Sequence, residues 1–236
     1  MTWSHTKSDT FLIFRKAFIP QRERIVESVI QFIRHTRDET FTFADICPGD
    51  GWLTKAILSH FPKAKVIALD RTDMLQRTLK PAITSFERRV TYQDFDLKAE
   101  TWTKQLTPVS YYVSSFSLYE IDDAYKRTFL KQLYRSLQPD GGVMFLEMIA
   151  PTDEAELVQF ADELDAIVRE QSMLYFGSEE AYDYYANNEW NMYRDPHTTF
   201  QPLSVARYLR LLNDVGFNTV MVTPLAAGHV LFSGRK

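Results

Sequence analysis

The sequence predicts an α/β fold: a doubly wound, mostly parallel sheet with an antiparallel C-terminal hairpin strand and a helical lid insertion. Short strand-like segments alternate with helical segments of 10–16 residues up to residue 148, which is typical of such a sheet. Two further strand-like segments flank a four-residue turn near the end of the chain, which indicates a hairpin. Before them, segment 151–200 is too long for an ordinary connection, and insertions of this kind are usually lids or binding elements.

The alternating part follows an expected N-terminal helical cap, residues 1–40, in which residues 20–36 carry apolar side chains at helical spacing. The strands are expected to be short, and the second is apolar almost throughout, as buried parallel strands tend to be. They span 41–46, 65–70, 89–93, 110–115 and 142–148. The helices between them present one apolar face, and they span 52–61, 74–86 and 122–137.

The C-terminal part is expected to contain a helix over 203–215, which Gly216 ends because glycine readily adopts the left-handed conformation after a helix. Strands 219–224 and 229–233 then form the hairpin, so the last strand runs antiparallel in an otherwise parallel sheet. The first half of segment 151–200 is expected to be helical, because its apolar residues share one face. These residues are Leu157, Phe160, Leu164, Ile167 and Val168.

Composition and charge exclude several classes of protein. The formal net charge is −4, which argues against the basic field of nucleic-acid binders, although segment 151–200 alone carries −10 and the rest +6. The single cysteine cannot form an internal disulfide, and the five histidines show no metal-ligand spacing. No uncharged stretch approaches the length of a membrane span. We therefore expect a soluble cytoplasmic protein with no membrane partner, no metal, and no strong tendency to bind nucleic acid.

The most informative segment joins the first expected strand to the following helix. Its turn contains Gly49 and Gly51, and glycine allows a ligand to approach the backbone where the helix N-terminus offers free N–H groups. Nineteen residues after Gly51, the second strand ends in Asp70, where a carboxylate can accept hydrogen bonds from both hydroxyls of a ribose. This arrangement predicts an adenosine-containing ligand at the carboxyl ends of the strands.

Charge favours one adenosine ligand over another. A pyrophosphate cofactor would need a third glycine, where this chain has Thr54, and the carboxylates Asp45 and Asp50 would repel a diphosphate. The amino group and sulfonium of S-adenosylmethionine suit two nearby carboxylates better. We therefore favour S-adenosylmethionine over NAD.

Five segments of the chain together resemble the motifs of class I S-adenosylmethionine-dependent methyltransferases of the small-molecule type. They are the acidic glycine loop, the ribose-binding strand end, the adenine-binding turn, the segment beside the methyl group and the turn before strand five: 45–51, 69–75, 92–97, 113–119 and 137–142. The resemblance extends over residues 42–148 and 202–236. It implies a Rossmann-like methyltransferase domain over 41–236, with S-adenosylmethionine as cofactor and S-adenosylhomocysteine as product.

The resemblance also implies which residues contact the cofactor. They are Asp45, Cys47, Gly49, Gly51, Asp70, Arg71, Met74, Asp94, Phe95 and Ser114. Asp45 would lie near the methionyl amine, and Asp94 would meet the exocyclic amine of adenine. The chain departs from the family pattern at Cys47, which replaces the first glycine of the loop. A side chain there costs about 1 kcal/mol or more if the turn needs a left-handed residue.

The acceptor is expected to be a small molecule methylated on nitrogen or oxygen, and a cationic amine is slightly preferred. Carboxylates and aromatic rings together in segment 151–200 suit a cation. Candidate substrate contacts are Tyr119, Tyr185, Trp190 and Tyr193, and Tyr119 and His197 could deprotonate an acceptor.

Alternative interpretations remain open at this point. The acidic residues of segment 151–200 could form the solvated side of helices, with the aromatic residues packing a lid. The chain could bind the cofactor without catalysis, as a sensor or scaffold, which the replacement at Cys47 would favour. Transfer of another group from the same cofactor is a second enzymatic alternative. RNA methylation is disfavoured by the acidic insertion.

Overall fold

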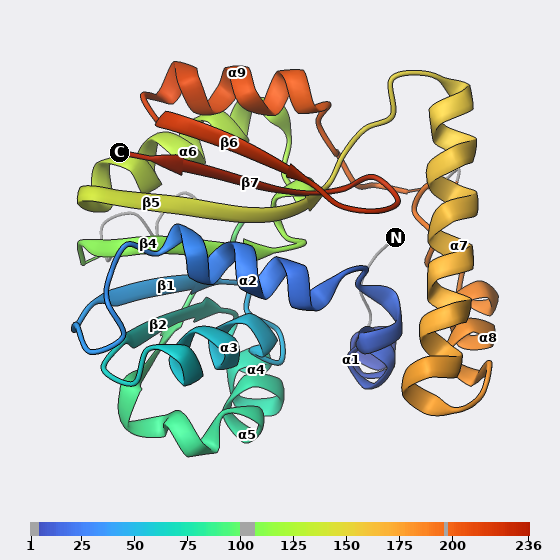
Figure 1. Ribbon diagram of the computed structural model, residues 1–236, viewed down its shortest axis with the longest axis horizontal. Helices are drawn as coiled ribbons and strands as arrows, with labels where there is room; N and C mark the ends of the chain where they lie inside the picture. The colour runs from blue at the N-terminus through green and yellow to red at the C-terminus, as the bar shows by residue number, and fades with distance from the viewer. Residues whose placement is uncertain (1–4, 100–106, 196–197) are drawn as a thin grey trace.

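The computed structural model describes residues 5–99, 107–195 and 198–236, and its centre is a seven-stranded sheet (Figure 1). The strand order is β3-β2-β1-β4-β5-β7-β6. Four neighbouring pairs from β3 to β5 are parallel, whereas β7 is antiparallel to both β5 and β6. The strands are β1 (Thr42–Ile46), β2 (Lys65–Asp70), β3 (Val90–Asp94), β4 (Val109–Ser115), β5 (Leu137–Met148), β6 (Asn218–Pro224) and β7 (His229–Arg235). The predicted doubly wound sheet with an antiparallel last strand is confirmed.

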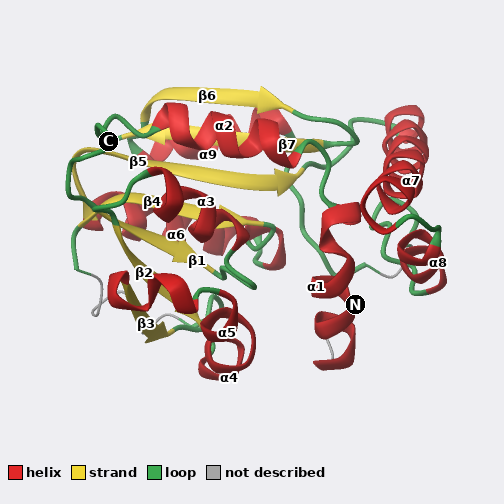
Figure 2. Ribbon diagram, turned by 60° about the horizontal axis from the view of Figure 1, so that its bottom comes forward, coloured by secondary structure: helices red, strands yellow, loops and turns green. Residues whose placement is uncertain are grey.

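Helices cover both faces of this sheet (Figure 2). On one face, α2 (Arg22–Phe32) and α3 (Trp52–His60) share an apolar cluster with the strands. On the other face, α6 (Asp123–Ser136) and α9 (Val205–Val215) share a second cluster with them. Because both faces are packed, the central strands are apolar on both sides, which explains their sequence.

The third layer of helices stands beside the sheet rather than on it. Helix α1 (His5–Phe18) packs against α7 (Glu154–Phe176) and α8 (Glu180–Asn187), and Figure 1 shows these three helices together at one end of the molecule. Their contact is a separate apolar cluster in which Phe14 and Phe18 of α1 meet side chains of α7 and α8. The predicted helical insertion is therefore present, and α1 is an element that the sequence pattern did not separate from the cap.

Two expected helices have different bounds because proline interrupts them. The helix expected over 20–36 spans only Arg22–Phe32. Pro20 disfavours helical backbone in the residue before it, so α1 ends at Phe18, and α2 begins after Gln21, whose φ is 52°. The helix expected over 74–86 is divided by Pro81, which has no N–H and would press its ring against a carbonyl one turn earlier. Its parts are α4 (Thr72–Met74), the π-helix η1 (Leu75–Leu79), α5 (Lys80–Ala82) and the 3₁₀-helix η2 (Thr84–Arg89).

Strand β5 begins earlier than the sequence predicts, but the expected turn lies inside it. Leu137 pairs with Val109, and the next paired residue is Gly142, opposite Tyr111. Residues 138–141 therefore leave the pairing, and Asp140 adopts a φ of 61° within this excursion. The glycine turn predicted before strand five is thus an irregularity in the β4–β5 ladder.

The C-terminal elements follow the sequence closely. Ser204 accepts a hydrogen bond from the Arg207 N–H at 3.3 Å and begins α9, and Gly216 ends it with a φ of 115°. Helix α7 begins in the same way at Asp153, which accepts from the Glu156 N–H at 2.8 Å.

Among the described residues, no helix is both long and apolar enough to cross a membrane.

Candidate functional site

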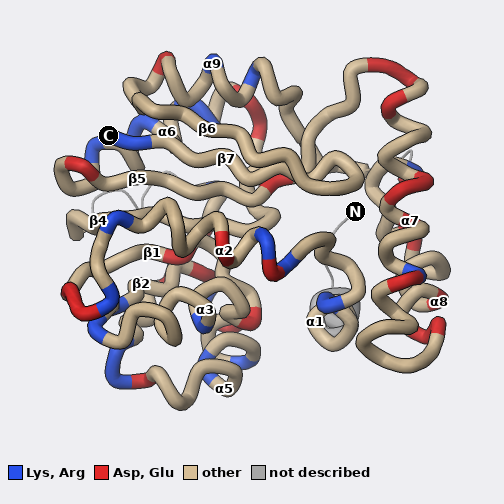
Figure 3. The backbone as a smooth tube through the Cα atoms, in the orientation of Figure 1, with Lys and Arg blue, Asp and Glu red and all other residues tan. Residues whose placement is uncertain are grey.

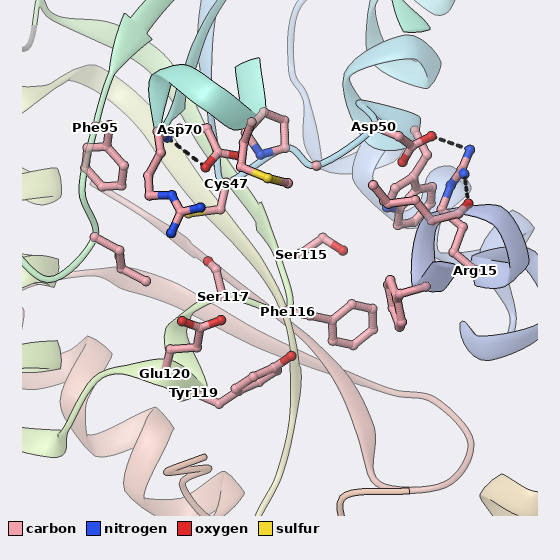
Figure 4. Close-up of a pocket in the computed structure, with 18 of the residues that line it drawn as sticks. Arg15, Cys47, Asp50, Asp70, Phe95, Ser115, Phe116, Ser117, Tyr119 and Glu120 are labelled. Atoms are coloured by element: carbon pink, nitrogen blue, oxygen red, sulfur yellow. Dashed lines mark hydrogen bonds and ion pairs between the residues drawn. The ribbon is translucent and has the colours of Figure 1, made fainter. Parts of the chain in front are cut away.

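A cavity of about 330 Å³ lies at the carboxyl ends of β1, β2, β3 and β4, and α1 covers it (Figure 4). We call it the main cavity. It is lined by the turn after β1, the end of β2, the segment after β3 and the segment after β4. Phe11, Leu12 and Arg15 of α1 and the following Ile19 complete the lining. Such a volume is typical of a small-ligand site. Residues of four of the five motifs thus gather around one space, and the turn 137–142 does not reach it.

The turn after β1 has left-handed backbone at three positions. Cys47 has a φ of 53°, Gly49 of 58° and Gly51 of 69°. The Cys47 N–H donates to the Leu69 carbonyl at 2.8 Å, which fixes the turn to β2. A side chain at Gly51 would lie 2.5 Å from Leu79 Cδ1, so only glycine fits there without displacing a neighbour. Cys47 therefore occupies the left-handed conformation in which a β-carbon is unfavourable. This is the case in which the sequence analysis expects a cost for replacing the glycine.

The Cys47→Gly substitution is expected to stabilise the protein slightly. Removing the β-carbon relieves about 1–2 kcal/mol of left-handed strain, and the greater freedom of glycine in the unfolded chain offsets about half of this. The melting temperature should rise by about 2 °C. Scanning calorimetry checks this, with Cys47→Ala as the control that removes the thiol but keeps the β-carbon. An equal rise in both variants would show that the thiol, not the backbone, is the cause.

Asp70 ends β2 with its carboxylate in the main cavity. Its side chain is held by the Arg71 N–H, which donates to Oδ1 at 2.9 Å, and the residue is only 8% exposed. Burial raises the pKa of Asp70 to about 6. Arg71 and Met74 line the same cavity, and the Arg71 side chain pairs with Asp73 at 3.0 Å. Phe95 lines it from the segment after β3, so these predicted residues are brought together.

Four predicted cofactor residues do not line the main cavity: Asp45, Gly51, Asp94 and Ser114. Asp45 is buried beneath the turn, where its carboxylate accepts from the Thr54 hydroxyl, and burial raises its pKa to about 7. Asp94 is exposed and accepts from the Thr72 N–H at 2.9 Å. Ser114 is buried and donates to the Ile46 carbonyl at 3.2 Å. Asp45 and Ser114 thus lie beside the cavity as parts of its walls, while Asp94 supports the turn after β2.

Other residues of the same motifs line the cavity, and the motif analysis did not select them. They are Pro48, Asp50, Asp96, Leu97, Ser115, Phe116 and Ser117, and Glu120 lines the cavity just beyond the last of these motifs. Four of the motif segments reach the main cavity, but which side chain of a loop faces it depends on the backbone at each strand end. Phe116, for instance, follows β4 with a φ of 58°, which turns the chain at this point.

An ion pair connects helix α1 to the glycine turn. Arg15 forms an ion pair with Asp50, as Figure 4 shows, and Lys55 lies 3.6 Å from the same carboxylate. The Arg22 guanidinium lies 4.5 Å from the centre of the Trp52 ring. These contacts hold the N-terminal segment beside the glycine turn.

A second, smaller cavity of about 70 Å³ adjoins the main cavity, and Phe11, Ile19, Phe116 and Tyr119 line both. We call it the small cavity. Its remaining lining residues come from α1, β5, the insertion and β7: Phe18, Met148, Leu164, Tyr185, Trp190, Met192, Asp195, Phe200 and His229. Tyr119, Tyr185 and Trp190, predicted as substrate contacts, thus meet in one aromatic space.

Another predicted substrate contact, Tyr193, stands apart from the small cavity. The Tyr193 hydroxyl donates to the carbonyls of Ile149 at 3.1 Å and Gly228 at 3.2 Å, and the residue lines neither cavity. His197 lies outside the described residues. His229 of β7, by contrast, lines the small cavity but was not selected from the sequence. The sequence of a strand does not indicate which of its side chains faces a cavity.

Tyr119 is positioned by a buried carboxylate. Glu147 of β5 accepts from the N–H groups of Leu118 and Tyr119, both at 3.1 Å, and so holds the 3₁₀-helix η4 (Leu118–Glu120). Burial raises the pKa of Glu147 to about 8. Burial also raises the pKa of Tyr119 well above its usual value, so this hydroxyl is protonated at neutral pH and can donate a hydrogen bond.

The carboxylates of segment 151–200 do not surround the cavities. None of its twelve acidic residues is buried, and only Asp195 lines either of the two cavities. Figure 3 shows acidic residues spread along α7 and α8. Two of them bind Arg194, whose guanidinium pairs with Asp162 and, at 2.6 Å, with Asp165. The solvated-helix interpretation therefore accounts for most of this charge.

Among the described residues, no group of His, Cys, Asp and Glu could hold a metal ion.

The sequence of the chain matches a known protein family. Residues 3–173 match the family model described as the O-methyltransferase domain. A curated relative, ribosomal RNA small subunit methyltransferase H of Borrelia duttonii, is 30% identical over 71 residues, covering 30% of this chain and 24% of its own length. This chain therefore spans only about a quarter of that relative.

Solved structures match over nearly the whole chain. Human N-acetylserotonin methyltransferase in complex with S-adenosylmethionine has a TM-score of 0.58 and 20% identity, covering 89% of this chain and 51% of that one. An O-methyltransferase family protein from Burkholderia thailandensis has a TM-score of 0.64 and 13% identity, covering 98% and 59%. At these identities the likeness establishes the fold, and this chain spans about half to three-fifths of those proteins.

Proposed function

The chain belongs to the family defined by the O-methyltransferase domain, and from this premise we propose that it transfers a methyl group from S-adenosylmethionine to a hydroxyl oxygen of a small molecule. The observation that carries the proposal is the position of Asp70. Its buried carboxylate faces the main cavity at the end of β2, beside a turn in which Gly49 lines the same cavity. This is where a ribose is bound in sheets of this class.

The residues present fit this cofactor. In our proposal, Asp70 accepts hydrogen bonds from the ribose hydroxyls, while Cys47, Gly49 and Gly51 contact it through the backbone. Arg71, Met74 and Phe95 enclose the adenine, and Asp45, Asp94 and Ser114 hold the walls of the site from behind. When bound, S-adenosylmethionine supplies an electrophilic methyl group and leaves as S-adenosylhomocysteine. The protein's own contribution is to hold the acceptor in line and to exclude water.

The acceptor is proposed to be an aromatic hydroxy compound. The small cavity is lined mainly by aromatic and apolar side chains, which favour a flat apolar ligand. The sequence preference for a cationic amine depended on carboxylates in segment 151–200, and these mostly lie away from both cavities. The protonated Tyr119 hydroxyl, which lines both cavities, is suited to donate to such a ligand rather than to deprotonate it.

We propose the same division of the chain that the sequence suggested. Residues 41–236 form the methyltransferase domain, segment 151–200 its lid, and residues 1–40 a cap. The apolar cluster that joins Phe14 and Phe18 of α1 to α7 and α8 supports a joint covering role for the cap and the lid.

The affinity for S-adenosylmethionine is expected to rise with pH. The pKa of Asp70 is raised to about 6 in the free protein, and the ionised carboxylate is the form that binds ribose hydroxyls best. The fraction ionised increases about tenfold between pH 5 and pH 7, so the association constant should increase roughly tenfold over the same range and then level off. Calorimetric titration at a series of pH values measures this, and Asp70→Asn should remove the dependence. A flat profile in the wild type would contradict it.

The proposed function is tested by the release of S-adenosylhomocysteine. The full chain is incubated with S-adenosylmethionine and a panel of phenols, aromatic amines and carboxylates, and products are identified by mass spectrometry. Methylation of phenols supports the proposal, and methylation confined to amines refutes the oxygen preference. Cofactor binding without transfer to any member of the panel favours the sensor alternative. Methylation of RNA instead of small molecules would overturn the substrate class.

A further inference from the structure

The small cavity contains polar atoms that the protein itself leaves without partners. Among the described residues, the Tyr185 hydroxyl and the Trp190 indole N–H are buried and make no hydrogen bond, and both residues line this cavity. A buried donor without a partner costs about 1–3 kcal/mol, so such groups usually meet a ligand or an ordered water. Two of them in one aromatic space indicate a ligand that carries a hydrogen-bond acceptor.

His229 contributes the complementary group to the same cavity. The residue is 2% exposed, and its Nδ1 lies 3.1 Å from the Ala226 carbonyl oxygen and 2.9 Å from that of Ala227. Because carbonyl oxygens only accept, Nδ1 carries the proton, and Nε2 is left with a lone pair. Burial lowers the pKa of His229 to about 4, so the ring is neutral at neutral pH. No described residue donates a hydrogen bond to Nε2.

His229 is also close to the junction of the two cavities. Its ring meets the ring of Phe116 edge to face, with the centroids 5.4 Å apart, and Phe116 lines both cavities. Phe116 is fixed by its N–H, which donates to the Leu146 carbonyl at 2.8 Å. A ligand group beside His229 therefore lies next to the wall of the main cavity.

We propose that Nε2 of His229 accepts a hydrogen bond from a hydroxyl of the methyl acceptor, while Tyr185 and Trp190 donate to a second polar group on the same molecule. This inference rests on the proposed function and specifies its acceptor as a flat aromatic compound with one donor and one acceptor group. His229 acts as a binding residue. The turn that precedes β7 fixes its tautomer through two carbonyl groups, so the ring is prepared before the ligand enters.

A pair of probes that differ only in the hydroxyl tests the role of His229. We expect the full chain to bind 2-naphthol at least tenfold more tightly than naphthalene in calorimetric titrations without cofactor. His229→Asn should lose this preference, because its amide N–H can replace Nδ1 at the carbonyls but nothing replaces Nε2. His229→Gln places an amide oxygen near Nε2 and should retain part of the preference. Melting curves establish that both variants are folded.

A spectroscopic readout separates this role from a structural one. The ¹⁵N resonance of Nε2, assigned by comparison with His229→Asn, should shift with 2-naphthol and not with naphthalene. Failure of 2-naphthol to bind, or an unchanged preference in folded His229→Asn, overturns the inference. Titration with S-adenosylmethionine is measured separately. If it binds while the naphthol preference is unaffected by His229→Asn, this inference fails and the proposed function stands.

Discussion

Asp70→Ala is expected to weaken the binding of S-adenosylmethionine by about 100-fold or more, because two hydrogen bonds to an ionised carboxylate, each contributing about 1.5–3 kcal/mol, are lost. The carboxylate is the acidic group at the end of β2 that lines the main cavity. Asp70 has no ion-pair partner within the part of the chain that the structure describes, so removing its buried charge should not destabilise the free protein. The substitution is thus expected to separate binding from folding, and calorimetric titration and melting curves on the same preparation measure both.

A neighbouring aspartate provides the matched control. Asp73 lies three residues further along, is exposed, and pairs with Arg71 at 3.0 Å. Asp73→Ala removes the same charge from the same turn but no group that we assign to the ribose, so its affinity should stay within about threefold of wild type, as for an exposed ion pair. Equal losses in both variants would show that the general negative charge, rather than the position of Asp70, is responsible.

Gly142→Ala is expected to destabilise the protein by about 2–3 kcal/mol, because over-packing a tight core site forces the backbone to move. A β-carbon at this position would lie 2.7 Å from Phe32 Cε1 and 2.8 Å from the Gly234 carbonyl oxygen. The second contact is with the backbone of the paired strand β7, which cannot turn aside as a side chain could. The melting temperature should fall by about 5–10 °C.

Two variants distinguish over-packing from other effects of alanine. Gly177→Ala meets no atom within 4 Å but has a φ of 69°, so it measures backbone strain alone and should cost about 1 kcal/mol. Phe32→Leu combined with Gly142→Ala relieves only the contact with the ring, so most of the loss should remain. Full recovery in the double variant would show that β5 and β7 have room to separate.

The succession of strands and helices along the chain could be predicted from the sequence because local patterns decide it. Alternating apolar segments, the glycine after the last helix and the four-residue turn each reflect a backbone preference that acts over a few residues. Pro81 marks the limit of this reasoning. The apolar spacing of 74–86 is helical, yet a proline divides the segment into α4, η1, α5 and η2.

The loops of the site could likewise be predicted, but their individual side chains could not. The predicted segment 92–97 reaches the main cavity, yet Asp96 rather than Asp94 lines it. The choice depends on how the chain leaves β3, where Asp94 is used by the N–H and hydroxyl of Thr72. Thr72, which is 22 residues away in the chain, thus determines where the Asp94 side chain lies. A local sequence pattern cannot predict such a contact.

By itself, the sequence therefore determined the doubly wound sheet, the hairpin, the insertion and four of the segments that meet at the main cavity, because periodicity, turn residues and motif spacing are local properties. Only the tertiary structure decided the lining of the small cavity, where we propose that the acceptor binds. It turned most of the acidic residues of 151–200 away from both cavities, tied the Tyr193 hydroxyl to the backbone, and brought His229 from the last strand beside Tyr185 and Trp190. These outcomes depend on how α1, α7 and α8 pack against the strand ends, which are contacts between segments far apart in the chain.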